Sequence, residues 1–305
     1  MGSARKALFA ALLLQSLVLP AFSGPFEDAE AAYERQDFAA ALTIWRRLAD
    51  QGNALSQIRV GGLYADGLGV PRDYVEAAKW FRRAADQGNA RAQFNLGSIF
   101  YYGQGVPQDY TEAVKWFRQA GDHGYAPAQA ILGTVFAEGQ GVARDDAEAA
   151  KWYRLAAEQG HAPSQFNLAL RYVKGQGLPQ DDAAAVKWAK LAADQGHVLA
   201  RYNLGNMYSS GRGVARDDVE AARWYSLAAD QGYVLAQSTL SLKYINGVGV
   251  PKDMVQALKW ISLAVMRGDK RSEGDRDALA KTMTPAQVAE ATKLARDWKP
   301  TPPPR

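Results

Sequence analysis

The sequence predicts an all-α protein, a right-handed α-solenoid of stacked antiparallel helical hairpins. Tryptophan recurs every 36 residues, and glycine, alanine and aspartate columns recur with the same step. Within each unit, apolar residues follow helical spacing in two stretches that a glycine-rich segment separates. Repeats of this length indicate hairpins that bury their apolar faces only by stacking on their neighbours. The tryptophan column consists of Trp80, Trp116, Trp152, Trp188, Trp224 and Trp260.

Residues 1–23 have the features of a cleavable signal peptide. Two basic residues precede the apolar segment 7–19, which is too short to cross a hydrocarbon core comfortably. Small residues then predict a cut between Ser23 and Gly24. We therefore expect a periplasmic or secreted protein without an integral membrane segment after cleavage. An uncleaved anchor or a buried helix is the alternative.

A shortened leading hairpin is expected over residues 24–52, and six full repeats over 53–268. In the repeat that starts near residue 89, an apolar stripe predicts a first helix over about 90–102. Gly103 ends this helix, because glycine adopts left-handed backbone angles at little cost. Asp109 is expected to cap the second helix, with Glu112 three residues on as in a capping box.

Residues 269–299 leave the repeat pattern and are expected to form capping helices. A short helix is predicted over 276–281. Thr284, followed by proline, predicts the start of a last helix that runs to about Trp298. The proline-rich tail, 300–305, is expected to be extended and solvated.

The repeat has the pattern A-x-x-x-L-G-x-x-Y-x-x-G-x-G-V-x-x-D-x-x-x-A-x-x-W-x-x-x-A-A-x-x-G, which the unit from Ala200 to Gly232 follows closely. This pattern resembles the Sel1-like repeat, a relative of the tetratricopeptide repeat. The resemblance implies an exported bacterial member of a family that acts in assembly and signalling. Three positions depart from the pattern: Ala169 and Ser241 replace the first-helix glycine, and Ala189 replaces the aromatic residue that follows Trp188.

Composition and motifs give little material for catalysis. The absence of cysteine excludes disulfides, cysteine-ligated zinc and a thiol nucleophile. The formal charge of +4 over 305 residues does not indicate nucleic-acid binding. The S-x-x-K match at Ser3–Lys6 falls inside the predicted signal peptide. His161 and His197 occupy equivalent positions one repeat apart, where a metal pair is the alternative to ordinary junction residues. We therefore predict no catalytic residues, no metal and no cofactor.

The concave groove is the better candidate for a binding site. One stripe on the first helices varies between repeats, which is typical of a binding face on a fixed scaffold. Packing between hairpins is the alternative role for these side chains. A neighbouring column, mostly glutamine, is regular enough to predict a structural hydrogen bond. The predicted partner-binding residues are Phe94, Tyr101, Tyr102, Phe166 and Tyr202.

The sequence thus favours a non-enzymatic periplasmic scaffold, adaptor or regulator that binds a protein or peptide in its groove. Envelope components are candidate partners. A β-lactamase-like or cell-wall hydrolase is one alternative, by analogy with relatives that are rich in cysteine. A peptidoglycan-binding protein is another.

Overall fold

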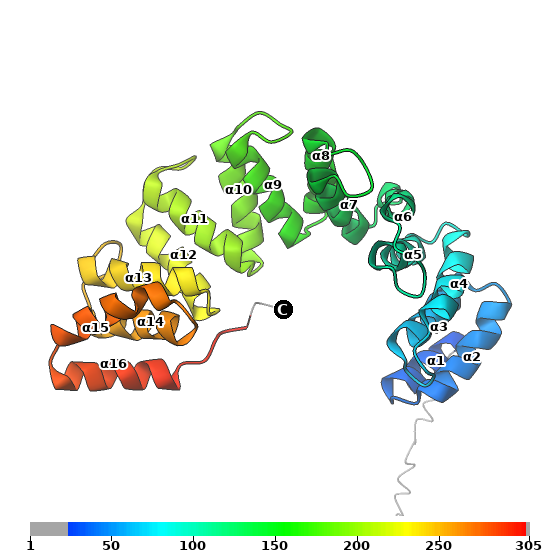
Figure 1. Ribbon diagram of the computed structural model, residues 1–305, viewed down its shortest axis with the longest axis horizontal. Coiled ribbons are helices and arrows are strands. Elements are labelled where there is room, and N and C mark those ends of the chain that lie inside the picture. Colours follow the sequence, from blue (N-terminus) through cyan, green and yellow to red (C-terminus); the bar gives the residue numbers. More distant parts are fainter. Residues whose placement is uncertain (1–23, 303–305) are drawn as a thin grey trace, which may run out of the picture. The chain divides into compact units, whose positions relative to one another are not determined.

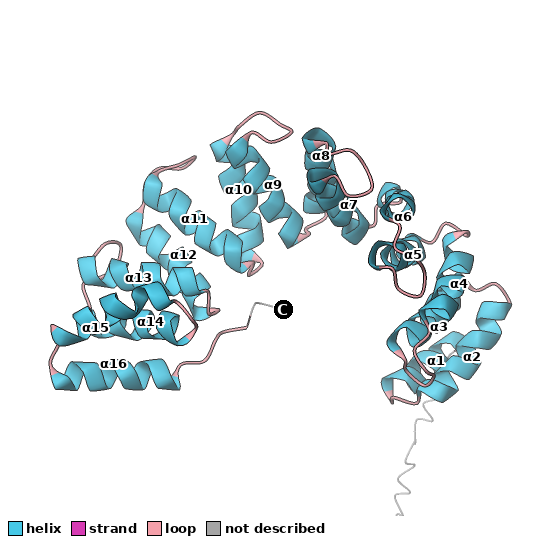
Figure 2. Cartoon of the chain, in the orientation of Figure 1, coloured by secondary structure: helices cyan, strands magenta, loops and turns pink. Residues whose placement is uncertain are grey.

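The computed structural model describes residues 24–302 and is helical throughout this range (Figure 1). Residues 24–302 contain sixteen α-helices and one 3-10 turn, joined by short loops, and no strand (Figure 2). Within each unit, consecutive helices pack against one another, and the chain is an all-α helical-hairpin solenoid. The predicted signal peptide, 1–23, and the last three residues of the tail lie outside the described residues.

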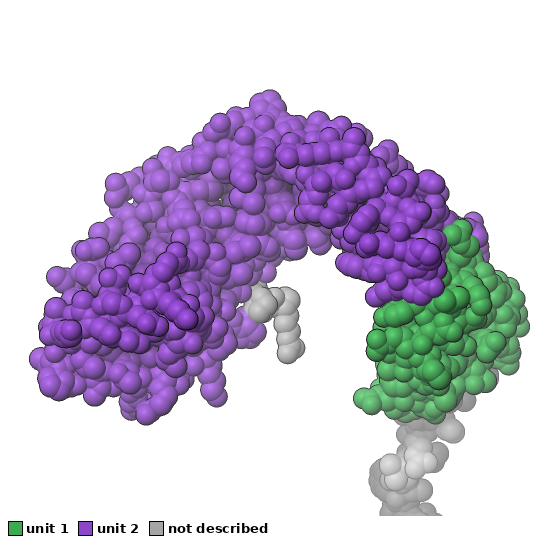
Figure 3. Space-filling view, in the orientation of Figure 1, with its two compact units in different colours: residues 1–84 green, residues 85–305 purple. Residues whose placement is uncertain are grey.

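The chain divides into two compact units, and the division falls between Ala84 and Ala85 (Figure 3). Unit 1 holds the leading hairpin and most of the next one. Its core surrounds Trp45 and Trp80, which are both buried. Its helices are α1 (Pro25–Glu34), α2 (Phe38–Asp50), α3 (Ala54–Asp66) and α4 (Tyr74–Ala85), whose last residue belongs to unit 2.

Unit 2 holds five further hairpins and the C-terminal helices. Its hairpin helices are α5 (Ala90–Tyr102), α6 (Tyr110–Asp122), α7 (Ala126–Glu138), α8 (Asp146–Glu158), α9 (Ala162–Lys174), α10 (Asp182–Asp194), α11 (Val198–Ser210), α12 (Asp218–Asp230), α13 (Val234–Asn246) and α14 (Met254–Met266). The 3-10 turn η1 (Lys270–Ser272) and the helices α15 (Glu273–Lys281) and α16 (Pro285–Asp297) follow.

The hairpin of α5 and α6 shows how the sequence sets helix ends. Gly103 follows α5 with φ 65°, the left-handed conformation expected of it. The Asp109 side chain caps α6 by accepting from the Glu112 backbone N–H. The reciprocal half of the predicted capping box does not form, because the Asp109 N–H already donates to the Phe100 carbonyl at 3.0 Å. The Glu112 carboxylate instead accepts from Trp116 Nε1 at 3.0 Å.

Tryptophan fills the space between successive hairpins, as Trp152 on α8 illustrates. Its ring lies against Gly121 of the preceding hairpin, where an added Cβ would come within 3.0 Å of the indole. The same cluster includes Leu132 on α7 and Leu168 on α9, and all three side chains are buried. The stacking that the 36-residue period predicted therefore buries apolar side chains between successive hairpins.

The glutamine column forms the structural hydrogen bond that its regularity predicted. Each side chain lies at the start of a first helix and donates to a carbonyl near the end of the preceding second helix. Arg201, the one exception in the column, donates to the equivalent carbonyl through Nε at 3.0 Å. The pairs are Gln57–Ala49, Gln93–Ala85, Gln129–Gly121, Gln165–Ala157, Arg201–Ala193 and Gln237–Ala229.

The C-terminal region differs from expectation in one place. Helix α15 begins at Glu273 rather than 276, because Asp269 holds the turn before it by accepting from Ser272 Oγ at 2.8 Å. The described part of the tail is not helical and is exposed, as predicted. The Thr301 N–H donates to the Asp230 carbonyl at 2.7 Å. The last helix also begins with the predicted Thr284 cap.

Candidate functional site

Three of the five predicted partner-binding residues lie on α5. Phe94 is half-buried, with its ring centroid 5.6 Å from that of Phe117 and 5.3 Å from that of Tyr125. These neighbours come from α6 and from the residue before α7. Phe94 therefore packs within its own hairpin and against the start of the next one.

Tyr101 and Tyr102 form an edge-to-face pair at the end of α5, with centroids 5.0 Å apart. Tyr101 also packs edge-on against Tyr110 at 5.0 Å, and its hydroxyl donates to Gln140 Oε1 in the next hairpin. Burial raises the pKa of the Tyr101 hydroxyl above its usual value. Tyr102 is 62% exposed. The cluster thus fixes Tyr101 and presents Tyr102 to solvent.

Phe166 and Tyr202 lie on α9 and α11. Phe166 is 8% exposed and its ring lies 4.8 Å from that of His197. Tyr202 is half-buried between Tyr225 and Tyr233, at 5.7 and 5.1 Å. Both residues therefore pack between hairpins. A partner-binding role for the five aromatic residues stays a prediction.

A pocket of about 490 Å³ opens beside Phe166, between the hairpins α9/α10 and α11/α12. This volume is in the range of small-ligand sites. Apolar side chains of α9, α10 and α11 form much of its wall, and short polar side chains of α11 lie along the rest. The lining residues are Phe166, Ala169, Leu170, Val173, Ala189, Asn203, Asn206, Met207, Ser209, Ser210, Arg212 and Tyr225.

Hydrogen bonds fix the polar part of this pocket. The Tyr225 hydroxyl donates to Asn206 Oδ1 at 2.7 Å, and burial raises the pKa of this hydroxyl to about 12. It therefore stays protonated at neutral pH. Arg212, in the loop after α11, donates through Nε to Asp182 at 2.9 Å and through a terminal nitrogen to the Val173 carbonyl at 2.8 Å. The loop is thus tied to the preceding hairpin.

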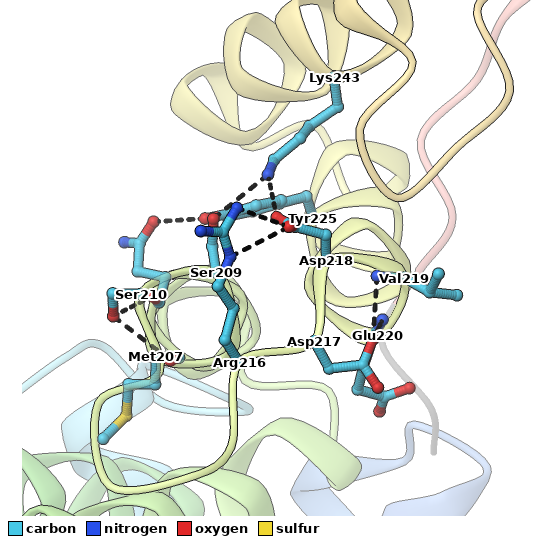
Figure 4. Close-up of polar contacts among 11 residues, drawn as sticks. Met207, Ser209, Ser210, Arg216, Asp217, Asp218, Val219, Glu220, Tyr225 and Lys243 are labelled. Atoms are coloured by element: carbon cyan, nitrogen blue, oxygen red, sulfur yellow. Dashed lines mark hydrogen bonds and ion pairs between the residues drawn. The ribbon is translucent and has the colours of Figure 1, made fainter.

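An ion-pair network borders the pocket (Figure 4). Lys243 on α13 lies 2.9 Å from the Asp218 carboxylate and 3.2 Å from Ser209 Oγ. Arg216 lies 2.8 Å from the same carboxylate. The hydrogen bond from Lys243 is the main cause that holds the pKa of Asp218 below its usual value, followed by the bond from Arg216. The carboxylate is therefore charged and compensated, which is a structural role rather than an acid–base one.

His161 and His197 take part in local hydrogen bonds. His197 Nδ1 accepts from the Ala200 N–H at 3.2 Å and so caps α11. His161 Nδ1 lies 2.9 Å from Ser164 Oγ. Burial lowers the pKa of both imidazoles. Within residues 24–302, no three histidine or carboxylate side chains converge as metal ligands would.

The polar lining residues were not identified from the sequence. Asn203, Asn206, Ser210 and Arg212 belong to variable columns of the repeat and have no motif of their own. The available signal was the pair of departures in the fourth repeat, Ala169 and Ala189, both of which line the pocket.

Comparison with known proteins identifies the family of the chain. The Sel1 repeat matches six consecutive segments, 54–89, 90–125, 126–161, 162–197, 198–233 and 235–269. No curated protein matches the chain. Sel1 repeats generally mediate protein–protein interactions, and proteins of this family are typically non-catalytic scaffolds. No helix within residues 24–302 has both the length and the apolar character that crossing a bilayer requires.

Two solved structures are similar along most of the chain. A Sel1 repeat protein from Oxalobacter formigenes is 32% identical, with a TM-score of 0.68, over 79% of this chain and 97% of that one. A protective antigen of uropathogenic Escherichia coli strains, with an SLR fold, is 30% identical, with a TM-score of 0.55, over 90% of this chain and 68% of that one. The chain belongs to the Sel1 repeat family.

Proposed function

We propose that the protein is a non-catalytic scaffold that works outside the cytoplasm, in the periplasm or after secretion, and binds a protein partner through its first-helix face. This face is the surface of α5, α7, α9, α11 and α13. The observation that carries the proposal is the tyrosine cluster of α5. Tyr102 is 62% exposed and packs edge-on against Tyr101, whose ring packs in turn against Tyr110.

A preorganised, exposed tyrosine suits protein recognition. Its ring gives a large contact area, and the edge-to-face contact with Tyr101 limits the rotamer freedom that is lost on binding. Tyrosine is also enriched among the residues that dominate binding energy at protein interfaces. The core of the hairpin does not need the exposed ring, so a stability role does not account for it.

The extracytoplasmic location rests on the basic and apolar pattern of residues 1–23. The Escherichia coli relative is described as a protective antigen, which supports export for this chain as well. Fractionation of cells that express the full chain tests the location. A mature N-terminus at Gly24 in the periplasmic or culture fraction is the expected result. Full-length protein retained in the cytoplasm would refute it.

Crosslinking in cells tests the binding function. Tagged protein is crosslinked in the envelope fraction, captured, and its partners are identified by mass spectrometry. Tyr102→Ala should reduce the main partner at least tenfold without changing the thermal melt. The matched control is Leu191→Ala on α10, a second helix, where the side chain is 41% exposed. Equal capture by wild type and Tyr102→Ala, or equal loss in both variants, would refute the assignment of this face.

A further inference from the structure

In most repeats, an aromatic side chain of the second helix lies directly on a glycine of the first helix. The approach is so close that a Cβ on the glycine would come within 2.5 to 2.8 Å of the ring. Each hairpin therefore closes by pairing a ring with the residue that lacks a side chain. The pairs are Gly61–Phe81, Gly97–Phe117, Gly133–Tyr153 and Gly205–Tyr225.

The fourth repeat replaces both members of this pair by alanine. Ala169 stands in place of the glycine, and Ala189 stands in place of the ring. One methyl group is added and a whole aromatic ring is removed, so the exchange leaves unfilled volume.

The pocket beside Phe166 occupies the position of the missing ring. In the preceding repeat, Tyr153 lies against Gly133, its hydroxyl lies 3.0 Å from Thr134 Oγ1, and Arg171 of the next hairpin lies over its ring. A step of 36 residues converts these three neighbours into Ala169, Leu170 and Met207. All three line the pocket. The cavity is therefore the ring site of the fourth repeat without its ring.

The surroundings of this site resemble those of an occupied ring site, with one difference. Phe166 and Leu170 give it apolar walls, and Met207 adds a flexible thioether that packs well against aromatic rings. The Ala169 methyl group keeps an incoming ring farther from α9 than the intramolecular rings lie. Asn203 and Ser210, which also line the pocket, can hydrogen-bond to a phenol or to a peptide backbone.

We propose that this pocket binds one aromatic side chain, phenylalanine or tyrosine, of the protein partner. The proposal rests on the scaffold function above and adds a specificity site to it. The other repeats indicate which side chain the pocket would bind, since phenylalanine or tyrosine rings fill the equivalent site in four of them. The partner's ring would complete the fourth hairpin as the chain's own ring completes the others.

The test uses p-cresol, which is the tyrosine side chain with a hydrogen in place of the backbone, and does not need the partner. Methionine methyl groups are labelled with ¹³C, and p-cresol is titrated into the protein. Met207 lines the pocket, whereas Met254, Met266 and Met283 serve as internal controls. We expect a saturable shift of the Met207 methyl signal alone, assigned by Met207→Leu. The absence of such a shift would overturn the proposal.

Two controls establish the site and its preference. Ala169→Gly/Ala189→Tyr restores the intramolecular ring and should weaken p-cresol binding at least tenfold, with a raised melting temperature. 4-Methylcyclohexanol has similar size without a flat ring and should bind at least threefold more weakly than p-cresol. Undiminished binding to the folded double variant, or equal affinity for both compounds, would overturn the proposal. If the double variant does not fold, the wild-type titration with the two compounds still decides the question.

The two proposals fail separately. If p-cresol does not bind but Tyr102→Ala still loses the partner, the scaffold function stands and the pocket assignment falls. If p-cresol binds and no partner is captured, the pocket exists and the scaffold function falls. Loss of the captured partner in Ala169→Gly/Ala189→Tyr would connect the two.

Discussion

Replacing Gly133 by alanine should destabilise the protein because of one ring. A Cβ at this position would lie 2.5 Å from Cδ1 of Tyr153, whereas ordinary contacts begin at 3.4 Å, so the ring must move by about 0.9 Å. The hydrogen bond of its hydroxyl to Thr134, at 3.0 Å, opposes this movement. Overpacking of this kind costs about 1–3 kcal/mol, and the helix preference of alanine over glycine offsets about 0.5–1 kcal/mol. We expect a net loss of about 1–2 kcal/mol.

The same substitution should become favourable once the ring is removed. Tyr153→Ala alone should cost about 3–4 kcal/mol, as truncation of a buried aromatic residue does. In that background, Gly133→Ala should stabilise by about 0.5–1 kcal/mol. Urea unfolding of the four proteins, followed by circular dichroism, gives the coupling energy if the m-values agree. Gly62→Ala on α3 is the control, because its Cβ would meet no heavy atom within 4 Å. Equal effects of Gly133→Ala in both backgrounds would refute the pairing of ring and glycine.

Three further predictions concern the stacking of hairpins and its dependence on pH. Trp152→Ala should cost about 3–5 kcal/mol in urea unfolding because the ring is buried between hairpins, and a loss under about 1 kcal/mol would contradict the stacking. Gln129→Leu should cost about 1–3 kcal/mol because it removes two hydrogen bonds, the one to the Gly121 carbonyl at 3.0 Å and the one from Gln159 Nε2 at 2.7 Å, and an unchanged unfolding midpoint would show that these bonds do not stabilise the stack. Burial lowers the pKa of His161 and His197 in the folded chain below the ordinary value of 6.5. As the pH falls through 6.5, the unfolded chain therefore binds more protons than the folded chain does. Stability should therefore fall as the pH drops below about 6.5. Replacing both histidines by asparagine should reduce the dependence of the melting temperature on pH between about pH 5.5 and 7.5. An unchanged dependence would show that other groups cause it.

Local chemistry allowed the helices to be predicted nearly to the residue. The helix expected over about 90–102 is Ala90–Tyr102, because a glycine with φ 65° ends it and an asparagine caps its start. The same holds for Thr284 at the start of α16. The prediction was wrong where a long-range partner decides the outcome. The Asp109 N–H bonds to the Phe100 carbonyl of the preceding helix, so the reciprocal bond of the predicted capping box does not form. No pattern within one helix reports such contacts.

The candidate site was less accessible from sequence for a related reason. A stripe of variable aromatic residues can be read from helical spacing, but its exposure depends on the neighbouring hairpin. Tyr102 is 62% exposed and Phe166 is 8% exposed, although both were assigned to the same face. The difference arises because Phe166 is covered by His197, one hairpin further on. The exposure of a side chain on the first-helix face therefore depends on the residues of the next repeat as well as on its own.

The sixth repeat shows why the exchange in the fourth repeat points to a ligand rather than to neutral variation. It also lacks the glycine–aromatic pair and has Ser241 and Ile261 instead. Ser241 is fully buried and donates to the Ala257 carbonyl at 2.8 Å, and Ile261 is 3% exposed, so these side chains are packed. Ser241 and Ile261 thus close the sixth hairpin without an aromatic ring. The fourth repeat uses Ala169 and Ala189, which leave an accessible pocket at a cost in packing. A partner's aromatic side chain would recover that packing on binding. In the Ala169→Gly/Ala189→Tyr variant the restored ring fills the pocket, so no site for the partner's side chain is left.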